Sequence, residues 1–220
     1  NYKKKWGTML KFIKKSLNLG VVYNLFIFMT GKFWVRQALL FAKYLPYSPG
    51  RKILDLGCGP GTNTQYFDPL DFLGIDIYEP YVKRAAKSSQ TIIFLVEFFK
   101  SQREYNDSFD FALMSGLLHH LPESTVIQFL KKSYAVLREG GSLIAIENCL
   151  DAKQSPLNRK IMLLDRGEFV RTSIELAALA SKSEFTFQIS IEGNLLMIRT
   201  HTQLSISENN HFLEIKDIAK

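Results

Sequence analysis

The chain has little cysteine, and its cysteines form no arrangement that could build a covalent or metal-based framework. Cys58 and Cys149 are the two cysteines among 220 residues. Neither belongs to a C-x-x-C pair, and no His/Cys cluster has the ligand spacing of a zinc site. We therefore expect no metal centre and no disulfide scaffold, and we expect a reducing, cytoplasmic environment.

The sequence also lacks an apolar run long enough to span a bilayer. The stretch from Lys3 to Met29 resembles a signal peptide, but Asn18 and Asn24 interrupt it and no A-x-A-like cleavage site follows. We expect one or two packed helices there with a solvated basic face. The alternative that stays open is peripheral membrane contact through this face, whose lysines are Lys3, Lys4, Lys5, Lys11, Lys14 and Lys15.

Neither low complexity nor internal repeats are found, and the composition is that of an ordinary globular protein. Hydrophobic residues make up 46% and charged residues 22%, which excludes global disorder. The net charge is +7 and the sequence pI is about 9.3. This balance is compatible with an acidic ligand, a nucleic acid or an anionic membrane, and it does not choose among them. The length suits one domain.

Apolar segments that suit strands alternate with segments that suit helices. Continuous apolar runs, typical of strands buried on both faces, occur at 52–56, 72–76, 92–96, 109–115 and 142–147. Helical spacing occurs at 61–67, 79–88, 123–137 and 173–182, and through most of the first 45 residues. This alternation predicts an α/β fold with a doubly wound, mostly parallel sheet.

The C-terminal part differs from this rhythm. Two strand-like runs flank Gly193–Asn194, which predicts an antiparallel β-hairpin that closes the sheet edge. We expect one domain over 1–220, made of an N-terminal helical cap (1–48), a ligand-binding core (51–148) and a segment 149–220 that holds the hairpin.

The stretch ILDLGCGPG, residues 53–61, follows the first expected strand and is rich in glycine. Ligands of parallel sheets bind at the carboxyl ends of strands, where glycines let a ligand approach the backbone. A P-loop would need lysine where Asn63 stands, so that motif fails. The dinucleotide pattern G-x-G-x-x-G fails because Thr62 stands where its third glycine should be.

The full pattern D-x-G-x-G-x-G resembles motif I of the class I S-adenosylmethionine-dependent methyltransferases. The resemblance continues in order over residues 51–148, through GIDI at 74–77, VE at 96–97, FDFALMSGLLHHL at 109–121 and LREGGSLIAIE at 137–147. It implies a Rossmann-like methyltransferase fold with a seven-stranded sheet. It also implies S-adenosylmethionine as the cofactor, with S-adenosylhomocysteine as the product.

The resemblance also assigns cofactor contacts. It implies that Asp55 helps to hold the methionine ammonium, that Asp76 accepts bonds from the ribose hydroxyls, and that Glu97 meets the adenine amino group. The full set of residues expected at the cofactor is Asp55, Gly57, Cys58, Gly59, Gly61, Asp76, Ile77, Glu97, Phe98 and Ser115. The competing interpretation gives Asp55 and Asp76 only turn- and helix-capping roles.

The acceptor side has weaker signals. His119 and His120 follow the fourth expected strand, and either could be a general base or a structural histidine ahead of Pro122. In the segment LDRGEFVRTS at 164–173, Arg166 or Arg171 could bind an acidic group of the acceptor, or could form ion pairs within an ordered loop.

Motifs that are missing narrow the acceptor. The [DNS]-P-P-[YFW] motif of enzymes that methylate base amines is absent, so no DNA partner is expected. We expect a small-molecule, sugar-like or lipid-like acceptor that attacks the methyl group in line. Two alternatives stay open, an RNA methyltransferase and a protein that binds S-adenosylmethionine without transferring its methyl group.

Overall fold

The computed structural model describes residues 33–86, 91–94, 105–150, 154, 156, 159, 167–183, 187–192 and 195–201. Its helices are α3 (Phe33–Tyr44), α4 (Glu79–Ala86), α6 (Glu123–Ala135) and α8 (Ser173–Ser181), with the 3₁₀ turns η1 (Thr62–Tyr66) and η3 (Leu118–His120). Its strands are β1 (Ile53–Leu56), β2 (Phe72–Asp76), β3 (Thr91–Phe94), β4 (Phe109–Ser115), β5 (Leu137–Asn148), β6 (Gln188–Glu192) and β7 (Leu195–His201).

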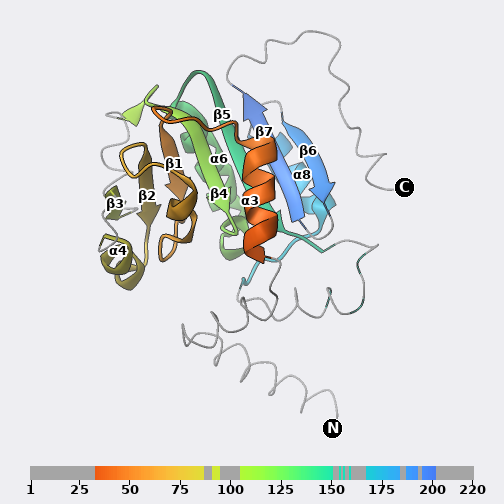
Figure 1. Ribbon diagram of the computed structural model, residues 1–220. Helices are drawn as coiled ribbons and strands as arrows, with labels where there is room; N and C mark the ends of the chain where they lie inside the picture. Colours follow the sequence, from red (N-terminus) through yellow and green to blue (C-terminus); the bar gives the residue numbers. More distant parts are fainter. Residues whose placement is uncertain are drawn as a thin grey trace.

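These strands form one sheet of seven strands in the order β3-β2-β1-β4-β5-β7-β6 (Figure 1). The pairs from β3 to β5 are parallel, whereas β7 runs antiparallel to both β5 and β6. The prediction of a mostly parallel, Rossmann-like sheet is therefore confirmed. The chain builds β1 to β3 toward one edge and β4 to β6 toward the other, so the strand order reverses between β1 and β4.

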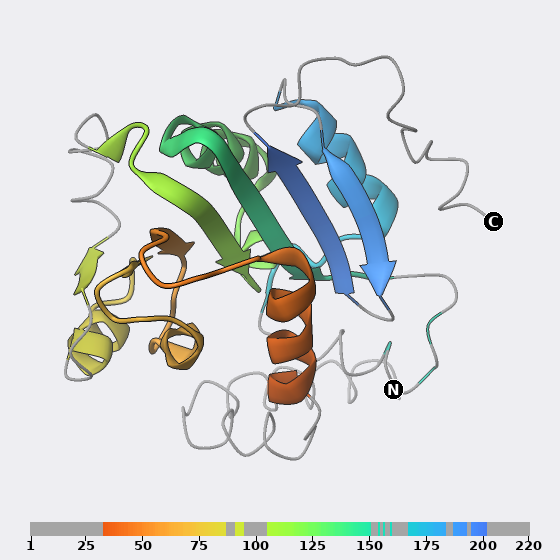
Figure 2. The same ribbon diagram turned by 45° about the horizontal axis from the view of Figure 1, so that its top comes forward.

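The core lies on both faces of the sheet because neighbouring strand residues point to opposite sides. Leu54, Met114 and Leu143 belong to a cluster with α6 and α8 on one face. Ile53 and Phe111 belong to a second cluster, which packs under α3 on the other face. Figure 2 shows α3 in front of the sheet and α6 and α8 behind it. The continuous apolar runs of the sequence reflect this burial on both sides.

Two element boundaries differ from the sequence prediction. The segment after Gly61 is a short 3₁₀ turn, Thr62–Tyr66, rather than an α-helix over 61–67. The helix predicted over 123–137 ends at Ala135, and β5 begins at Leu137, which pairs with Phe109. Gly140–Gly141 therefore lies within β5, where the register with β4 shifts.

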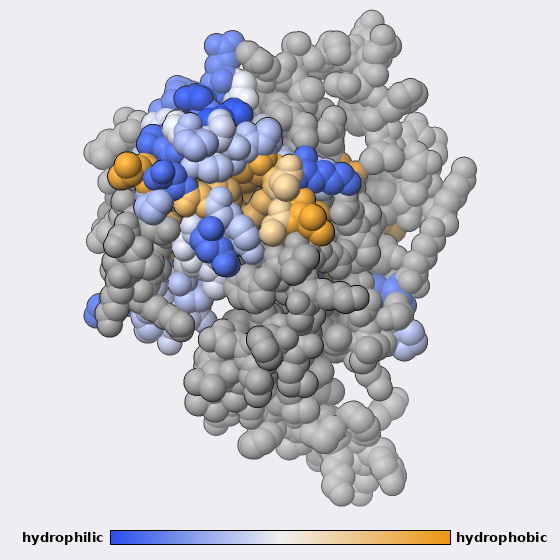
Figure 3. Space-filling view, viewed as in Figure 1, coloured by the Kyte–Doolittle hydropathy of each residue, from blue (hydrophilic) through white to orange (hydrophobic). Residues whose placement is uncertain are grey.

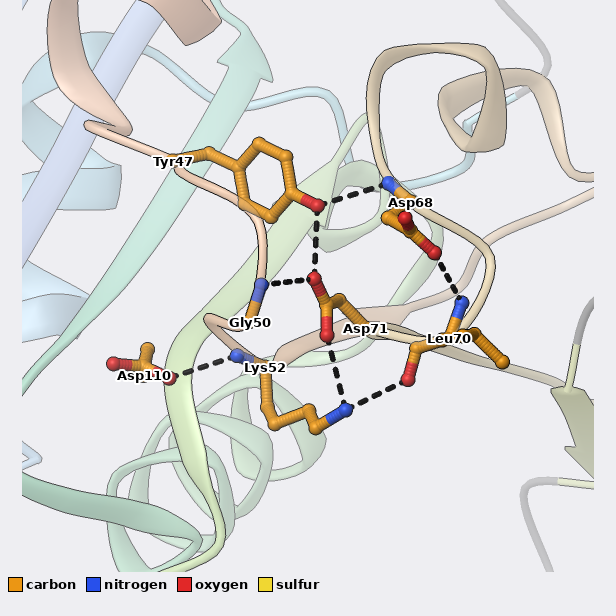
Figure 4. A network of polar contacts seen from close by, with 7 residues as sticks. All are labelled: Tyr47, Gly50, Lys52, Asp68, Leu70, Asp71 and Asp110. Carbon is orange, nitrogen blue, oxygen red and sulfur yellow. Dashed lines mark hydrogen bonds and ion pairs between the residues drawn. The ribbon is translucent and has the colours of Figure 1, made fainter.

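A polar network holds the amino-terminal ends of the strands together (Figure 4). Asp71, just before β2, accepts hydrogen bonds from Tyr47 Oη (3.0 Å), Gly50 N (2.6 Å) and Lys52 Nζ (3.0 Å). Asp110 in β4 accepts from Lys52 N at 2.7 Å. Because β1 starts directly after Lys52, the network fixes β1 against β2 and β4 at the end of the sheet opposite Asp55 and Asp76.

On the face seen in Figure 3, the described residues are mostly hydrophilic. In the view of Figure 3, apolar residues gather over α3, where the Leu39 side chain is 65% exposed. None of the helices in the described ranges is long and apolar enough to cross a membrane. The lysine-rich stretch from Lys3 to Lys15 lies outside the described residues.

Candidate active site

Four strands end at the same edge of the sheet, around the point where the strand order reverses. Asp55 lies near the end of β1, Asp76 ends β2, Ser115 ends β4 and Glu147 lies near the end of β5. Crevices at such reversal points are where open α/β sheets bind their ligands. The topology therefore brings together residues from four separate parts of the sequence.

The loop after β1 follows a path that favours glycine. Gly57, Gly59 and Gly61 have φ values of 73°, 56° and 80°, in the left-handed region that side chains with a Cβ rarely adopt. At Gly57 a Cβ would also lie 2.7 Å from Leu117 Cδ1, whereas at Gly59 nothing lies within 4 Å of it. The Gly57 backbone therefore packs against the segment after β4, and Gly59 borders open space that a ligand can approach.

Asp55 is a fully buried carboxylic acid with one oxygen left without a partner. Its Oδ2 accepts a bond from Asn63 Nδ2 at 2.9 Å, while Oδ1 is buried and has no hydrogen-bond partner. Burial is the main cause that raises the pKa of Asp55 to about 7. The hydrogen bond from Asn63 opposes this rise, and the negative charge of Asp76 adds to it. An acid held this way is well suited to meet a cationic group of a ligand.

Asp76 connects the glycine loop with the start of α4. Its Oδ2 accepts from Gly59 N at 2.9 Å, and its Oδ1 accepts from Tyr78 N at 2.8 Å. Each carboxylate oxygen can accept a further bond, and the side chain is only partly buried. Beside it, the Ile77 side chain is 70% exposed and so offers an apolar surface.

Cys58 faces the interior rather than the crevice. The thiol lies under β2, where a Cβ on Gly74 would be 2.9 Å from Cys58 Sγ. Burial raises the pKa of this thiol far above its usual range, and the charges of Asp55 and Asp76 add to the shift. The Cys58 side chain thus packs the loop onto the sheet, so its only route to a cofactor is through the backbone.

The two histidines after β4 have different environments. His119 is 5% exposed, and its Nδ1 lies 2.8 Å from Glu147 Oε2. Oε1 of the same Glu147 accepts from Leu117 N at 2.6 Å and Leu118 N at 2.7 Å. His120 is exposed, and its ring lies against the His119 ring in a tilted arrangement, with ring centroids 4.1 Å apart. An ionised Glu147 can only accept, so it directs the Nδ1 proton of His119 toward itself.

Arg171 is buried against backbone rather than presented to a ligand. Its side chain is 7% exposed and donates to Leu118 O at 2.9 Å, Phe169 O at 3.2 Å and Leu121 O at 2.7 Å. These contacts correct the expectation that Arg171 binds an acidic group of the acceptor. The guanidinium is committed to three carbonyl groups.

Three of the expected site residues, Glu97, Phe98 and Arg166, lie outside the described residues. Within the described ranges, no group of three or more His, Cys, Asp and Glu side chains is placed to hold a metal ion. The described residues at this edge of the sheet offer carboxylates, backbone amides and an imidazole.

Comparison with known proteins identifies the domain. Residues 53–141 match the family model described as a methyltransferase domain. Residues 53–141 form a methyltransferase domain. The cofactor of this domain is S-adenosylmethionine, as the glycine loop predicted.

The solved structures that resemble this methyltransferase domain share its fold. The mitomycin 7-O-methyltransferase MmcR has a TM-score of 0.62 at 20% identity, over 84% of this chain and 59% of that one. A possible histamine N-methyltransferase from Thermotoga maritima has a TM-score of 0.57 at 21% identity, over 85% of this chain and 98% of that one.

A curated relative is similar over a shorter stretch. Phosphoethanolamine N-methyltransferase 3 of Arabidopsis thaliana is 27% identical over 135 residues, which is 58% of this chain and 27% of that protein. The methyltransferase chain thus spans about a quarter of that relative's length.

Two residues of the methyltransferase site were missed by sequence reasoning. Asn63 is the hydrogen-bond partner of Asp55, and Glu147 is the partner of His119. Glu147 could have been found, because an acid that closes an otherwise apolar strand run lies at the ligand end of a parallel sheet. Asn63 could not be found in this way. The 3₁₀ turn Thr62–Tyr66 directs its side chain toward Asp55, whereas the sequence predicted an α-helix over this segment.

Proposed function

We propose that this protein transfers the methyl group of S-adenosylmethionine to a small-molecule acceptor. The observation that carries the proposal is the buried, unpartnered Asp55 Oδ1 beside a glycine loop and Asp76, at the reversal point of the sheet. An unsatisfied buried acceptor is costly, and a cationic ligand would satisfy it. The residues present therefore fit an amino-acid-bearing nucleoside.

Each residue of the loop has a role in this proposal. Asp55 binds the methionine ammonium through Oδ1, and Gly59 lets the methionine part lie along the backbone. Asp76 accepts from the two ribose hydroxyls with its remaining lone pairs, and Ile77 covers one face of the adenine. The expected contacts of Glu97 and Phe98 with the adenine remain part of the proposal.

Bound S-adenosylmethionine supplies an activated methyl group and a neutral leaving group, so alignment of the acceptor does much of the catalysis. Where the acceptor must lose a proton, we assign His119 as the general base and Glu147 as the residue that orients it. Glu147 binds the Nδ1 side, which leaves Nε2 as the nitrogen that takes up the proton. His119 is buried beside Glu147, whereas His120 is exposed, so we favour His119 over His120.

The acceptor belongs to the water-soluble or lipid-like small molecules rather than to nucleic acids. The relatives that carry substrate names support this choice, because those names refer to mitomycin and phosphoethanolamine. A lipid-like acceptor would also suit the basic residues near the N-terminus, for which membrane contact remains a proposal.

A transfer assay with labelled S-adenosylmethionine tests this function. The protein is incubated with a cell extract divided into water-soluble metabolites, lipids and RNA, and the Asp76→Asn variant serves as the control. We expect label in a metabolite or lipid fraction with the wild type and at least about tenfold less with the variant. Label confined to RNA would identify an RNA methyltransferase. Tight cofactor binding with no label in any fraction would indicate a binding protein.

A further inference from the structure

Arg171 joins two segments that are distant in the sequence. It precedes α8, and its guanidinium reaches across to η3, the turn that carries His119. One terminal nitrogen donates to Leu118 O at 2.9 Å and the other to Leu121 O at 2.7 Å. These two carbonyls flank the two histidines, so the guanidinium spans the turn from one side to the other.

The chemistry of this contact requires arginine. A buried cation is costly unless its donors are satisfied, and here they are satisfied by carbonyl oxygens. The planar guanidinium holds several N–H donors in a fixed fork, so it can bridge two carbonyls at once. A lysine ammonium is a single point on a flexible stem, and it cannot hold both ends of the turn in the same way.

The segment that contains Arg171 also lies directly on the imidazole of His119. Phe169 N donates to His119 O at 2.9 Å. A Cβ at Gly167 would lie 2.2 Å from His119 Cδ2 and 2.7 Å from His119 O, so only glycine fits against this ring. On its other side the segment is tied to the end of β5, because Leu150 N donates to Arg171 O at 2.9 Å.

We propose that Arg171 is a positioning residue that holds the Leu118–Leu121 turn so that the His119 imidazole lies between Glu147 and the backbone of Gly167. Arg171 touches neither cofactor nor acceptor in this scheme and acts through the two carbonyls. The expected effect of Arg171 on methyl transfer rests on the proposed function, whereas its effect on the position of His119 does not. Its effect on His119 can be measured without an acceptor.

The test follows the His119 ring by NMR in the full chain. The chain has four histidines, so a spectrum of ¹⁵N-labelled imidazoles is simple enough to assign with His119→Gln and His120→Gln variants. In the wild type we expect an exchange-protected Nδ1 proton on His119, because Glu147 accepts it in a buried site. The test variants are Arg171→Gln and Arg171→Lys, and Gly167→Ala disturbs the same contact from the other side.

Arg51→Gln is the matched control. It removes an arginine that pairs with buried Asp110 at the opposite end of β4, 2.9 Å from Nε to Oδ1. We expect the His119 Nδ1 proton to exchange at least about tenfold faster in Arg171→Gln, and to exchange as in the wild type in Arg51→Gln. Arg171→Lys is expected to fall between them. If Arg171→Gln does not fold, the exchange rate of the His119 Nδ1 proton in Arg171→Lys and Gly167→Ala tests the proposal instead.

An unchanged His119 signal in a folded Arg171 variant would overturn the proposal, as would an equal change in Arg51→Gln. With an acceptor in hand, kcat is expected to fall at least about tenfold in Arg171→Gln while the Kd for S-adenosylhomocysteine stays within about twofold. If the His119 signal responds as expected but the wild type transfers no methyl group, then the positioning role stands and the proposed function fails.

Discussion

Replacing Asp55 by asparagine is expected to stabilise the free protein and to weaken its binding of the cofactor. The physical reason is that a carboxylic acid with a buried, unpartnered oxygen disfavours ionisation. Its pKa is raised from the ordinary 3.8 to about 7 in the folded chain. Between these two values the folded state binds more protons than the unfolded state, so stability falls as the pH rises from about 4 through about 7.

The magnitude follows from the shift. A displacement of about three pKa units, at about 1.36 kcal/mol each, corresponds to an upper limit of about 4 kcal/mol at pH 8. Asparagine carries no charge at any pH and can still accept the bond from Asn63. Asp55→Asn should therefore unfold at a higher temperature than the wild type at pH 8, by up to the order of 10 °C for a chain of this size.

The assay is thermal unfolding of the wild type and Asp55→Asn at pH 5 and pH 8, with and without S-adenosylhomocysteine. We expect the variant's advantage to be larger at pH 8 than at pH 5, and to be reversed when the ligand is added, since the ligand stabilises only the wild type strongly. An advantage that is the same at both pH values would refute the reasoning about ionisation. Equal stabilisation of both proteins by the ligand would refute the role of Asp55 in binding.

Three further results are expected from the same contacts. The Kd of the wild type for S-adenosylhomocysteine, measured by calorimetry, should rise by up to about tenfold for each pH unit that the pH falls below about 7, because Asp55 must lose its proton to bind the ligand. A Kd that does not change with pH would contradict this. Gly57→Ala should cost about 1–3 kcal/mol more stability in chemical denaturation than Gly59→Ala, because the new Cβ at position 57 also meets the packed Leu117 side chain. Both variants should lose affinity for the ligand. Equal stability losses would argue against the packing of Gly57 on Leu117. Asp71→Asn should lower the unfolding temperature at neutral pH without changing ligand affinity, because the Gly50 amide and Lys52 hold the pKa of Asp71 below its usual range. The variant's deficit should vanish as the pH falls through that pKa.

Much of the sheet could be predicted from the sequence because burial on both faces leaves a simple signature. The run FDFALMS at 109–115 is apolar apart from Asp110 and Ser115, and the structure places β4 over these same residues. The boundaries around 135–141 could not be predicted in the same way. There the strand begins at Leu137 by pairing with Phe109, a contact between residues that the sequence does not bring together.

The cofactor side of the site leaves clearer signals in the sequence than the acceptor side. The glycine loop and Asp76 lie at fixed offsets from strand ends, so local sequence determines them. The acceptor side depends on contacts between segments about 50 residues apart, such as that of Arg171 with Leu118 O and Leu121 O. Charge suggested that Arg171 binds an acidic ligand, whereas tertiary packing gives it carbonyl partners. The position of Glu147 at a strand end can be read from the sequence, but its pairing with His119 appears only in the folded chain.

Binding of S-adenosylhomocysteine to the full chain, measured by calorimetry for the wild type and Asp76→Asn, tests the central claim most directly. We expect one site per chain with micromolar affinity for the wild type, and an affinity at least about tenfold weaker for the variant, because the two ribose hydroxyls lose their carboxylate. Absence of binding by the wild type, or equal affinity of the two proteins, would contradict that claim.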